Sequence, residues 1–215
     1  MTLQNRVAPD GTLHAVAARG MFTGNRGVIH DPRTRKPGGR RWTTKSWIVC
    51  VCDWKNVRRD VWGRNARGGG AGWSELFFLD EVTALAAGHR PCFYCRRTAA
   101  AAFAGAFDAG NALHATSALQ RDAILHHARR LSGNAPQTMI EQSALRELPD
   151  GAMIESDGEF LAISDGRALP WRFSGYRDPV RMPAKVRLVT PARRWRRLAR
   201  AIGRSGIAAQ GPDAS

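Results

Sequence analysis

Apolar and polar residues alternate in several short segments of this chain, which is the spacing expected of β-strands. Residues 42–54 are rich in β-branched and aromatic side chains, and residues 73–79 form an apolar run, so both are predicted strands. Further along, alternating segments flank two Asp-Gly dipeptides, at residues 157–158 and 165–166. Asp-Gly between alternating segments is a strong hairpin signal, so residues 150–175 are predicted to form a β-meander.

Helical signals are concentrated in the middle of the chain. A short helix is predicted over residues 81–87, with Asp80 as its N-cap and Gly88 in its C-terminal turn. Longer helices are predicted over residues 97–109 and 116–131, the second from apolar residues that recur at helical spacing. Strands and helices in this order predict an α+β fold.

The character of the sequence changes near residue 133 and again at Pro191. We therefore predict an α+β domain over residues 1–132 and a β-meander module over residues 133–190. Residues 191–215 begin with an arginine-rich segment and end in small and polar residues, which predicts a basic helix followed by a disordered tail.

Charge is the most unusual property of the composition. The chain has 215 residues and a formal net charge of +15, and 29 of its 33 basic residues are arginine. A bias toward GC-rich codons replaces lysine by arginine, but it does not explain why only 18 residues are acidic. Guanidinium groups match phosphate geometry, so the excess favours nucleic-acid binding.

No apolar run is long enough to span a bilayer, and the N-terminal residues lack the apolar stretch of a signal peptide. A cytoplasmic protein without membrane contact is therefore expected. In that compartment, close cysteine pairs indicate metal ligands more often than disulfides.

The four cysteines form two close pairs, Cys50 with Cys52 and Cys92 with Cys95. The second pair has the Cys-x-x-Cys spacing that supplies two ligands of a tetrahedral zinc site. The alternatives are ordinary buried cysteines or a redox motif, but no thioredoxin-like pattern surrounds the pair. Residues two apart on a strand face the same side, so Cys50 and Cys52 could both face one Zn²⁺ site.

A histidine is the alternative fourth ligand, because Cys-x-Cys on a strand is an uncommon ligand spacing. The candidates are His30, His89, His126 and His127, and His89 is nearest in sequence to the Cys-x-x-Cys pair. His89 could equally support the site by hydrogen bonds to a ligand. The domain over residues 1–132 is thus predicted to be a zinc-knuckle domain.

The stretch "LFFLDEVTALAAGHRPCFYCRR" within residues 73–97 resembles the end of the Ada-type metal-binding domain, found in DNA alkylation-repair proteins and attached to bacterial nucleases. The residues that match its motif are Ala84, Ala86, Ala87, Gly88, Arg90, Pro91, Cys92 and Cys95. The resemblance implies a zinc site of four cysteines, or of cysteines and a histidine, that touches the DNA backbone. The upstream half departs from that pattern, with 39 residues between Cys52 and Cys92.

The whole chain also resembles an uncharacterised bacterial protein family through the stretches "LQNRV", "GNRG" followed by "HD", "RRW" and "AAGHRPC". In that family the position of Cys50 is a cysteine, whereas that of Cys52 often is not. This resemblance favours Cys50 as a ligand and implies no activity.

Three enzymatic interpretations compete with a structural zinc site. The Ada resemblance implies that a zinc thiolate, here Cys50, accepts a methyl group from DNA. A nuclease would need a cluster of carboxylates or histidines to hold a cation. The third interpretation takes "GNRG" as a phosphate-binding turn in which the Arg26 guanidinium binds the phosphate. The alternative for this motif is a simple β-turn. The scattered nuclease candidates are His30, Asp31, Glu75, Asp80, Glu81, His126 and His127.

Basic residues surround the cysteines in sequence, as a phosphate-binding surface would require. The predicted nucleic-acid contacts are Arg26, Arg40, Arg41, Arg58, Arg59, Arg64, Arg67, Arg90, Arg96, Arg97, Arg193, Arg194 and Arg197. For the last three, a solvated helix or contact with a membrane or acidic partner is the alternative.

Together these patterns predict a zinc-binding, DNA-binding protein that contacts the phosphate backbone. A metal-dependent nuclease or DNA-repair enzyme is the first alternative, and a basic adaptor for an acidic protein partner is the second.

Overall fold

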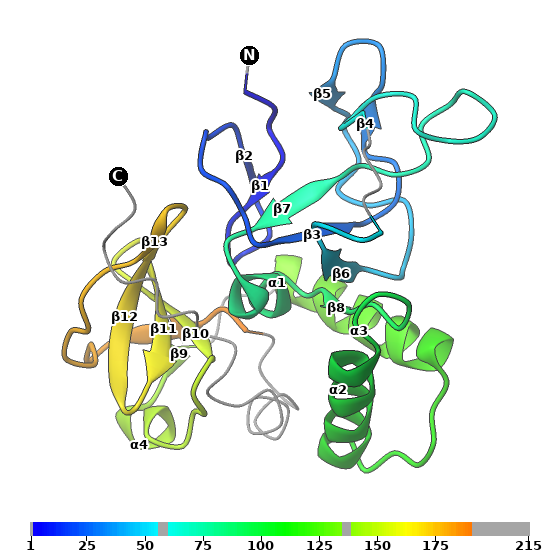
Figure 1. Cartoon of the computed structure of the whole chain (residues 1–215). Helices are drawn as coiled ribbons and strands as arrows, with labels where there is room; N and C mark the ends of the chain where they lie inside the picture. Colours follow the sequence, from blue (N-terminus) through cyan, green and yellow to red (C-terminus); the bar gives the residue numbers. More distant parts are fainter. Residues whose placement is uncertain (1, 56–59, 135–138, 191–215) are drawn as a thin grey trace.

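The computed structural model describes residues 2–55, 60–134 and 139–190, and Figure 1 shows their arrangement. These residues form four helices and three sheets, which confirms the predicted mixture of helices and strands. The predicted basic helix after Pro191 lies outside the described residues, and the proposed domain boundaries stay predictions. No helix within the described ranges is long and apolar enough to cross a bilayer.

The first large sheet has six short strands in the order β2-β1-β7-β3-β6-β8. These strands are β1 (Arg6–Val7), β2 (Leu13–His14), β3 (Phe22–Asn25), β6 (Ile48–Val51), β7 (Leu76–Phe78) and β8 (Arg90–Pro91). Strand β3 pairs antiparallel with β6 and β7, whereas β6 and β8 are parallel. A separate two-stranded ribbon consists of β4 (His30–Asp31) and β5 (Lys36–Pro37).

The second large sheet contains the meander predicted from the Asp-Gly turns. Its six strands lie in the order β13-β12-β11-β10-β14-β9. They are β9 (Met139–Ile140), β10 (Met153–Ser156), β11 (Glu159–Ser164), β12 (Arg167–Arg172), β13 (Gly175–Tyr176) and β14 (Val186–Leu188). Both residues of each Asp-Gly pair have positive φ, 49° and 81° in the first and 48° and 71° in the second, as a two-residue hairpin turn requires.

Helix α1 (Glu81–Ala86) lies between the two large sheets (Figure 1). Asp80 accepts a hydrogen bond from the Thr83 amide at 2.8 Å, which confirms the predicted N-cap, and Gly88 follows with φ of 84°. The same cap reaches the second sheet, since Tyr176 donates to the Asp80 carboxylate at 2.8 Å and the Trp171 indole donates to the Thr83 hydroxyl at 3.0 Å.

The remaining helices are α2 (Arg97–Gly110), α3 (Ala118–Asn134) and the short α4 (Gln142–Leu145). Helices α2 and α3 lie on the side of β8, and α4 lies at one end of the second sheet (Figure 1). Phe103 and Phe107 of α2 pack with Leu125 of α3 and with Leu85 of α1 in a buried cluster. This cluster packs α2 and α3 against α1.

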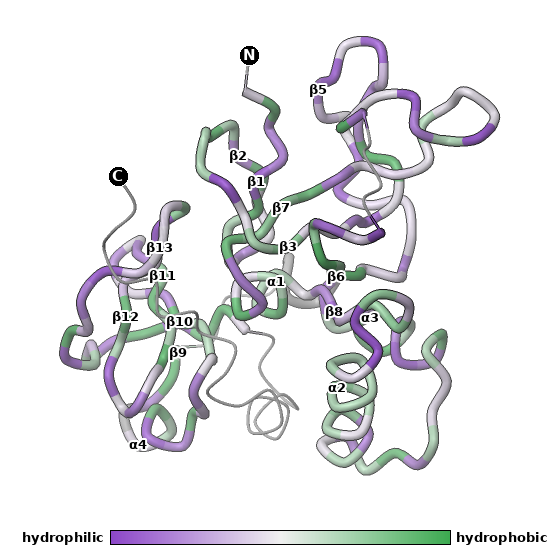
Figure 2. Tube along the Cα trace, in the orientation of Figure 1, coloured by the Kyte–Doolittle hydropathy of each residue, from purple (hydrophilic) through white to green (hydrophobic). Residues whose placement is uncertain are grey.

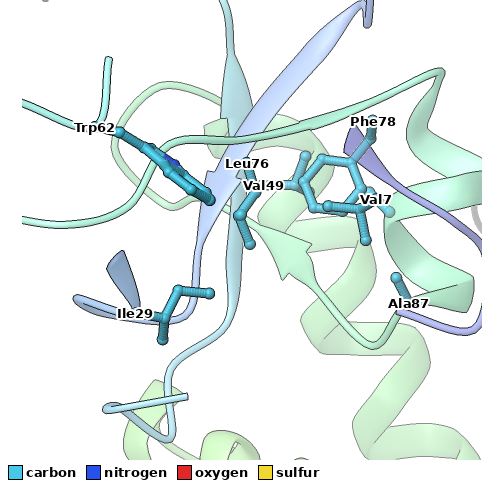
Figure 3. Packing of buried hydrophobic residues seen from close by; sticks show 8 residues of the cluster. Val7, Ile29, Val49, Trp62, Leu76, Phe78 and Ala87 are labelled. Carbon is cyan, nitrogen blue, oxygen red and sulfur yellow. The ribbon is translucent and has the colours of Figure 1, made fainter. Parts of the chain in front are cut away.

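The main hydrophobic core contains side chains from the strands of the first sheet, and Figure 3 shows how they pack. Val7 of β1, Val49 of β6, and Leu76 and Phe78 of β7 are completely buried. The hydropathy colouring of Figure 2 shows apolar residues along β6 and β7, whereas β5 and β8 are hydrophilic. Burying one such side chain contributes roughly 1.5–3 kcal/mol, so this core holds β6 in place within the first sheet through Val49.

Candidate metal centre

Three of the four cysteines meet where β6 and β8 end side by side. In this parallel pair Ile48 is opposite Arg90 and Val49 is opposite Pro91. The Cys92 amide continues the ladder by donating to the Val49 carbonyl at 3.0 Å, which places Cys92 beside Cys50. The turn after β8 then brings back Cys95, and the three sulfur atoms all lie within 4.8 Å of one another.

The thiols of this three-cysteine cluster share their protons unequally. The pKa of Cys92 is lowered to about 5, first by the hydrogen bond from the Cys50 thiol and then, against the effect of burial, by the amides of Cys95 and Tyr94. The Tyr94 amide lies 3.4 Å from the Cys92 sulfur. The pKa of Cys50 is raised, first by its hydrogen bond to Cys92 and then by burial. The lowered pKa favours the thiolate form of Cys92, which is the form that binds a metal.

The cluster has the dimensions of a tetrahedral thiolate site. A Zn–S distance of about 2.3 Å places two thiolates of a tetrahedron roughly 3.8 Å apart. Sulfur atoms within 4.8 Å of one another fit that arrangement after a small contraction. In the described part of the chain, no fourth side chain of the ligand types Cys, His, Asp or Glu joins the group.

Cys52 lies outside the cluster, contrary to the expectation that it faces the same site as Cys50. The reason is that β6 ends at Val51, so the alternation of a regular strand does not extend to residue 52. The Cys52 thiol is instead directed toward the Gly20 carbonyl, 3.8 Å away, and the residue is exposed.

His89 is also separate from the cysteine cluster, although it is the nearest histidine in sequence. Its side chain is completely buried between the rings of Trp47 and Phe78, with ring centroids 5.2 and 4.7 Å away. Its Nε2 accepts a hydrogen bond from Arg26 at 3.3 Å. Burial and the charges of Arg26 and Arg129 hold the pKa of His89 well below its usual value, so it is a neutral core residue.

The other candidate histidines, His30, His126 and His127, do not belong to the three-cysteine cluster either. His30 stacks on Trp62 with centroids 5.2 Å apart and forms a hydrogen bond with Ser74. His126 packs edge-on against Trp42, and His127 is exposed on α3.

The acidic nuclease candidates are dispersed, and most of them have structural partners. Glu75 accepts hydrogen bonds from the Trp62 amide and from Asn65. Asp80 caps α1, and Glu81 forms an ion pair with Arg96 at 2.8 Å. Within the described residues, the only group of three or more ligand-type side chains close enough to hold a metal is the three-cysteine cluster.

Three of the arginines predicted to contact nucleic acid are engaged inside the protein. Arg90 forms a two-pronged ion pair with Asp122, both at 2.7 Å, and both residues are buried. Arg96 holds Glu81, and Arg26 is 1% exposed. As placed, Arg90 and Arg96 are occupied by carboxylates, and the Arg26 side chain is almost entirely buried. The structure places the other described members of the set at the surface: Arg40, Arg41, Arg64, Arg67 and Arg97. Outside the described residues lie Arg58, Arg59, Arg193, Arg194 and Arg197.

Two aromatic residues between Cys92 and Cys95 form a surface feature that the sequence patterns did not predict. Phe93 and Tyr94 are 39% and 70% exposed. Tyr94 packs edge-on against Trp54 with centroids 5.5 Å apart, and the Lys55 ammonium lies 5.7 and 5.9 Å from the two rings. The signal in the sequence was two aromatic residues inside a Cys-x-x-Cys turn, where nothing requires an apolar side chain.

Comparisons of this chain with protein-family models, with curated proteins and with solved structures find no match.

Proposed function

We propose that this chain is a zinc-binding protein that binds nucleic acid, with DNA as the expected form. The observation that carries the proposal is the cluster of Cys50, Cys92 and Cys95 at the joined ends of β6 and β8. Sulfur-rich sites of this size suit Zn²⁺ better than Mg²⁺ or Ca²⁺, which prefer oxygen ligands. Zinc bound there would neutralise the thiolates and fix the knuckle to the sheet.

The nucleic-acid part of the proposal is supported by charge and by the surface around the knuckle. The net charge is +15, and Arg40, Arg41, Arg64, Arg67 and Arg97 are exposed. Phosphate contacts supply most of the sequence-independent affinity for nucleic acid. Exposed Tyr94, with Lys55 nearby, adds a ring on which a base can stack. The resemblance of residues 73–97 to the Ada-type domain agrees with this proposal.

Metal analysis of the purified protein tests the zinc site. We expect about one zinc per chain in the wild type and none when Cys92 and Cys95 are both replaced by Ser. The matched control is Cys52→Ser, which removes a thiol outside the cluster and should leave the zinc content unchanged. Equal zinc content in the double variant and the wild type would exclude this site.

Binding of a labelled DNA duplex at several salt concentrations tests the nucleic-acid surface. If Arg64 and Arg67 each contact a phosphate, replacing both by Ala reduces the slope of log K against log salt by about 2. Arg181→Ala is the control, since Arg181 is an exposed arginine near the second sheet. A slope that is the same in all three proteins would contradict the proposed surface. Divalent-dependent cleavage of the duplex would instead indicate a nuclease.

A further inference from the structure

Arg26 is a buried cation, and no carboxylate among the described residues forms an ion pair with it. Its guanidinium lies over the Trp47 ring at 4.4 Å, and its Nη1 donates to the Gly11 carbonyl at 2.9 Å. Its Nε donates to the neutral His89 at 3.3 Å. The charge of Asp10 acts on Arg26, but Asp10 Oδ1 accepts hydrogen bonds from the amide and the hydroxyl of Thr12.

The remaining nitrogen of this guanidinium, Nη2, is buried and has no hydrogen-bond partner among the described residues. A buried donor left unpaired is costly, and more so when it carries charge. Burial first, and then the charges of Arg41 and Arg129, lower the pKa of Arg26 to about 9. The fold thus holds a cationic donor against repulsion from two neighbouring arginines.

Arg41 directs a second donor to the same point. A Cβ placed on Gly11 would lie 3.2 Å from Arg26 Nη2 and 3.3 Å from Arg41 Nη2, so the two nitrogens converge beside a residue that has no side chain. The segment after Arg41 is fixed to Arg26, because the amides of Thr43 and Thr44 donate to the Arg26 carbonyl at 2.9 and 3.2 Å. The convergence therefore follows from the backbone as well as from side-chain positions.

We propose that Arg26 and Arg41, beside Gly11, form a binding site for a phosphate-type oxyanion. An oxyanion would accept from both Nη2 groups, supply the missing partner of Arg26 and offset the repulsion between the two guanidiniums. Arg41 is the movable member, since it is exposed and its contact with the Asp10 carbonyl is long, at 3.3 Å. Arg26 is the fixed member. The site needs neither the metal nor nucleic acid, because its ligand is the anion itself.

Titration of the full-length, zinc-supplemented protein with inorganic phosphate tests the site. Calorimetry measures the affinity, and thermal unfolding measures the stabilisation. In both experiments sodium chloride of equal ionic strength is the reference. We expect one saturable site in the wild type. Arg41→Ala should weaken phosphate binding at least about tenfold, the loss that accompanies removal of a charge-assisted hydrogen bond. Arg40→Ala removes the same charge from the adjacent exposed position and should change the affinity less than about twofold.

Equal weakening by Arg40→Ala and Arg41→Ala would overturn the proposal, because it would show diffuse attraction to a basic surface. Absence of any phosphate effect beyond that of chloride in the wild type would overturn it too. Arg41→Lys keeps the charge but loses the planar fork, and we expect it to bind phosphate more weakly than the wild type.

Oligonucleotides with and without a 5′-phosphate distinguish the source of the anion. A preference for the phosphorylated end that disappears in Arg41→Ala assigns the site to nucleic-acid ends. Equal binding of both oligonucleotides, together with saturable inorganic phosphate binding, assigns it to a small free phosphate compound. Because the phosphate titration uses no DNA, this inference and the proposed DNA binding can fail separately.

Discussion

The two large sheets of this protein differ in how many of their neighbouring strands are also consecutive in the chain. In the second sheet, β10 to β13 are neighbours both in the chain and in space, and the Asp157–Gly158 and Asp165–Gly166 turns join three of them. In the first sheet, β7 lies between β1 and β3, and β8 pairs with β6 across a long stretch of sequence. The candidate metal centre lies in the sheet that depends on distant segments.

This difference has an energetic consequence. Bringing distant segments together costs loop-closure entropy that a two-residue turn avoids. Cys50 and Cys92 are 42 positions apart in the chain. A metal bound to both would cross-link the two ends of the segment between them. The first sheet therefore has more to gain from a bound metal than the meander has.

Removal of the metal should have the largest effect on stability, and it should destabilise the first sheet more than the second. The amides of Arg90 and Cys92 donate to the Trp47 and Val49 carbonyls. With a chelator present, we expect the protection of these two amides against hydrogen exchange to fall by about 4 kcal/mol or more. Amides of β10 to β12 should lose much less. Hydrogen exchange read by mass spectrometry of peptides from each sheet measures both.

The double variant Cys92→Ser with Cys95→Ser serves as the control for chelation, since it should exchange alike with and without the chelator. Uniform loss of protection across both sheets would contradict the comparison. It would show that packing through α1, where Leu79 and Val82 meet Met153 and Trp171, makes the two sheets one cooperative unit.

The next largest effect is expected from the buried ion pair that supports β8. Asp122 of α3 is 2% exposed, and it also accepts a hydrogen bond from Ser46 at 2.6 Å. Asp122→Ala leaves the Arg90 charge buried and unpaired, so we expect a loss of about 3–5 kcal/mol in the free energy of unfolding, measured by urea denaturation. Arg90 precedes Cys92 by two positions, and zinc affinity should fall as well.

The meander offers the matched exposed pair, Arg172 with Glu159, whose side chains are 36% and 48% exposed. Glu159→Ala should destabilise the protein far less than Asp122→Ala, because solvent screens the pair. Equal losses in the two variants would mean that burial does not distinguish the two regions.

The smallest effect concerns the local turn chemistry of the meander. Gly158 has φ of 81° and open space where a Cβ would lie, so Gly158→Ala costs only backbone strain, about 1 kcal/mol. Gly105 in α2 also has open space, and Gly105→Ala should stabilise the protein by up to about 1 kcal/mol. Thermal unfolding of both variants should show opposite signs, and a stabilising Gly158→Ala would contradict the assigned turn.

Local patterns in the sequence predicted much of the fold. The Asp80 cap, the Gly88 turn, α2 and the meander follow from residues within a few positions of each other, and the structure confirms them. The predicted strand over residues 42–54 is only the four-residue β6, because its flanking residues bond to other parts of the chain. Strand ends depend on tertiary partners that periodicity does not reveal.

For the candidate site too, local patterns predicted some residues correctly and tertiary contacts decided the others. Residue type and spacing identified Cys92 and Cys95, and alternation placed Cys50 on a strand, but alternation also included Cys52, which lies beyond the strand end. Proximity in sequence suggested His89, which the core buries between aromatic rings. Arg26 and Arg90 were predicted to contact nucleic acid, whereas both are buried and form hydrogen bonds to partners more than 30 positions away.

The sequence by itself determined the element types, the two Asp-Gly turns, the thiol chemistry and the large positive charge, because each is a property of neighbouring residues or of composition. Only the tertiary structure decided which three cysteines meet, which arginines remain at the surface and which two guanidiniums converge beside Gly11. Those choices depend on the parallel pairing of β6 with β8 and on the burial of Arg26, and both result from contacts between segments far apart in the chain.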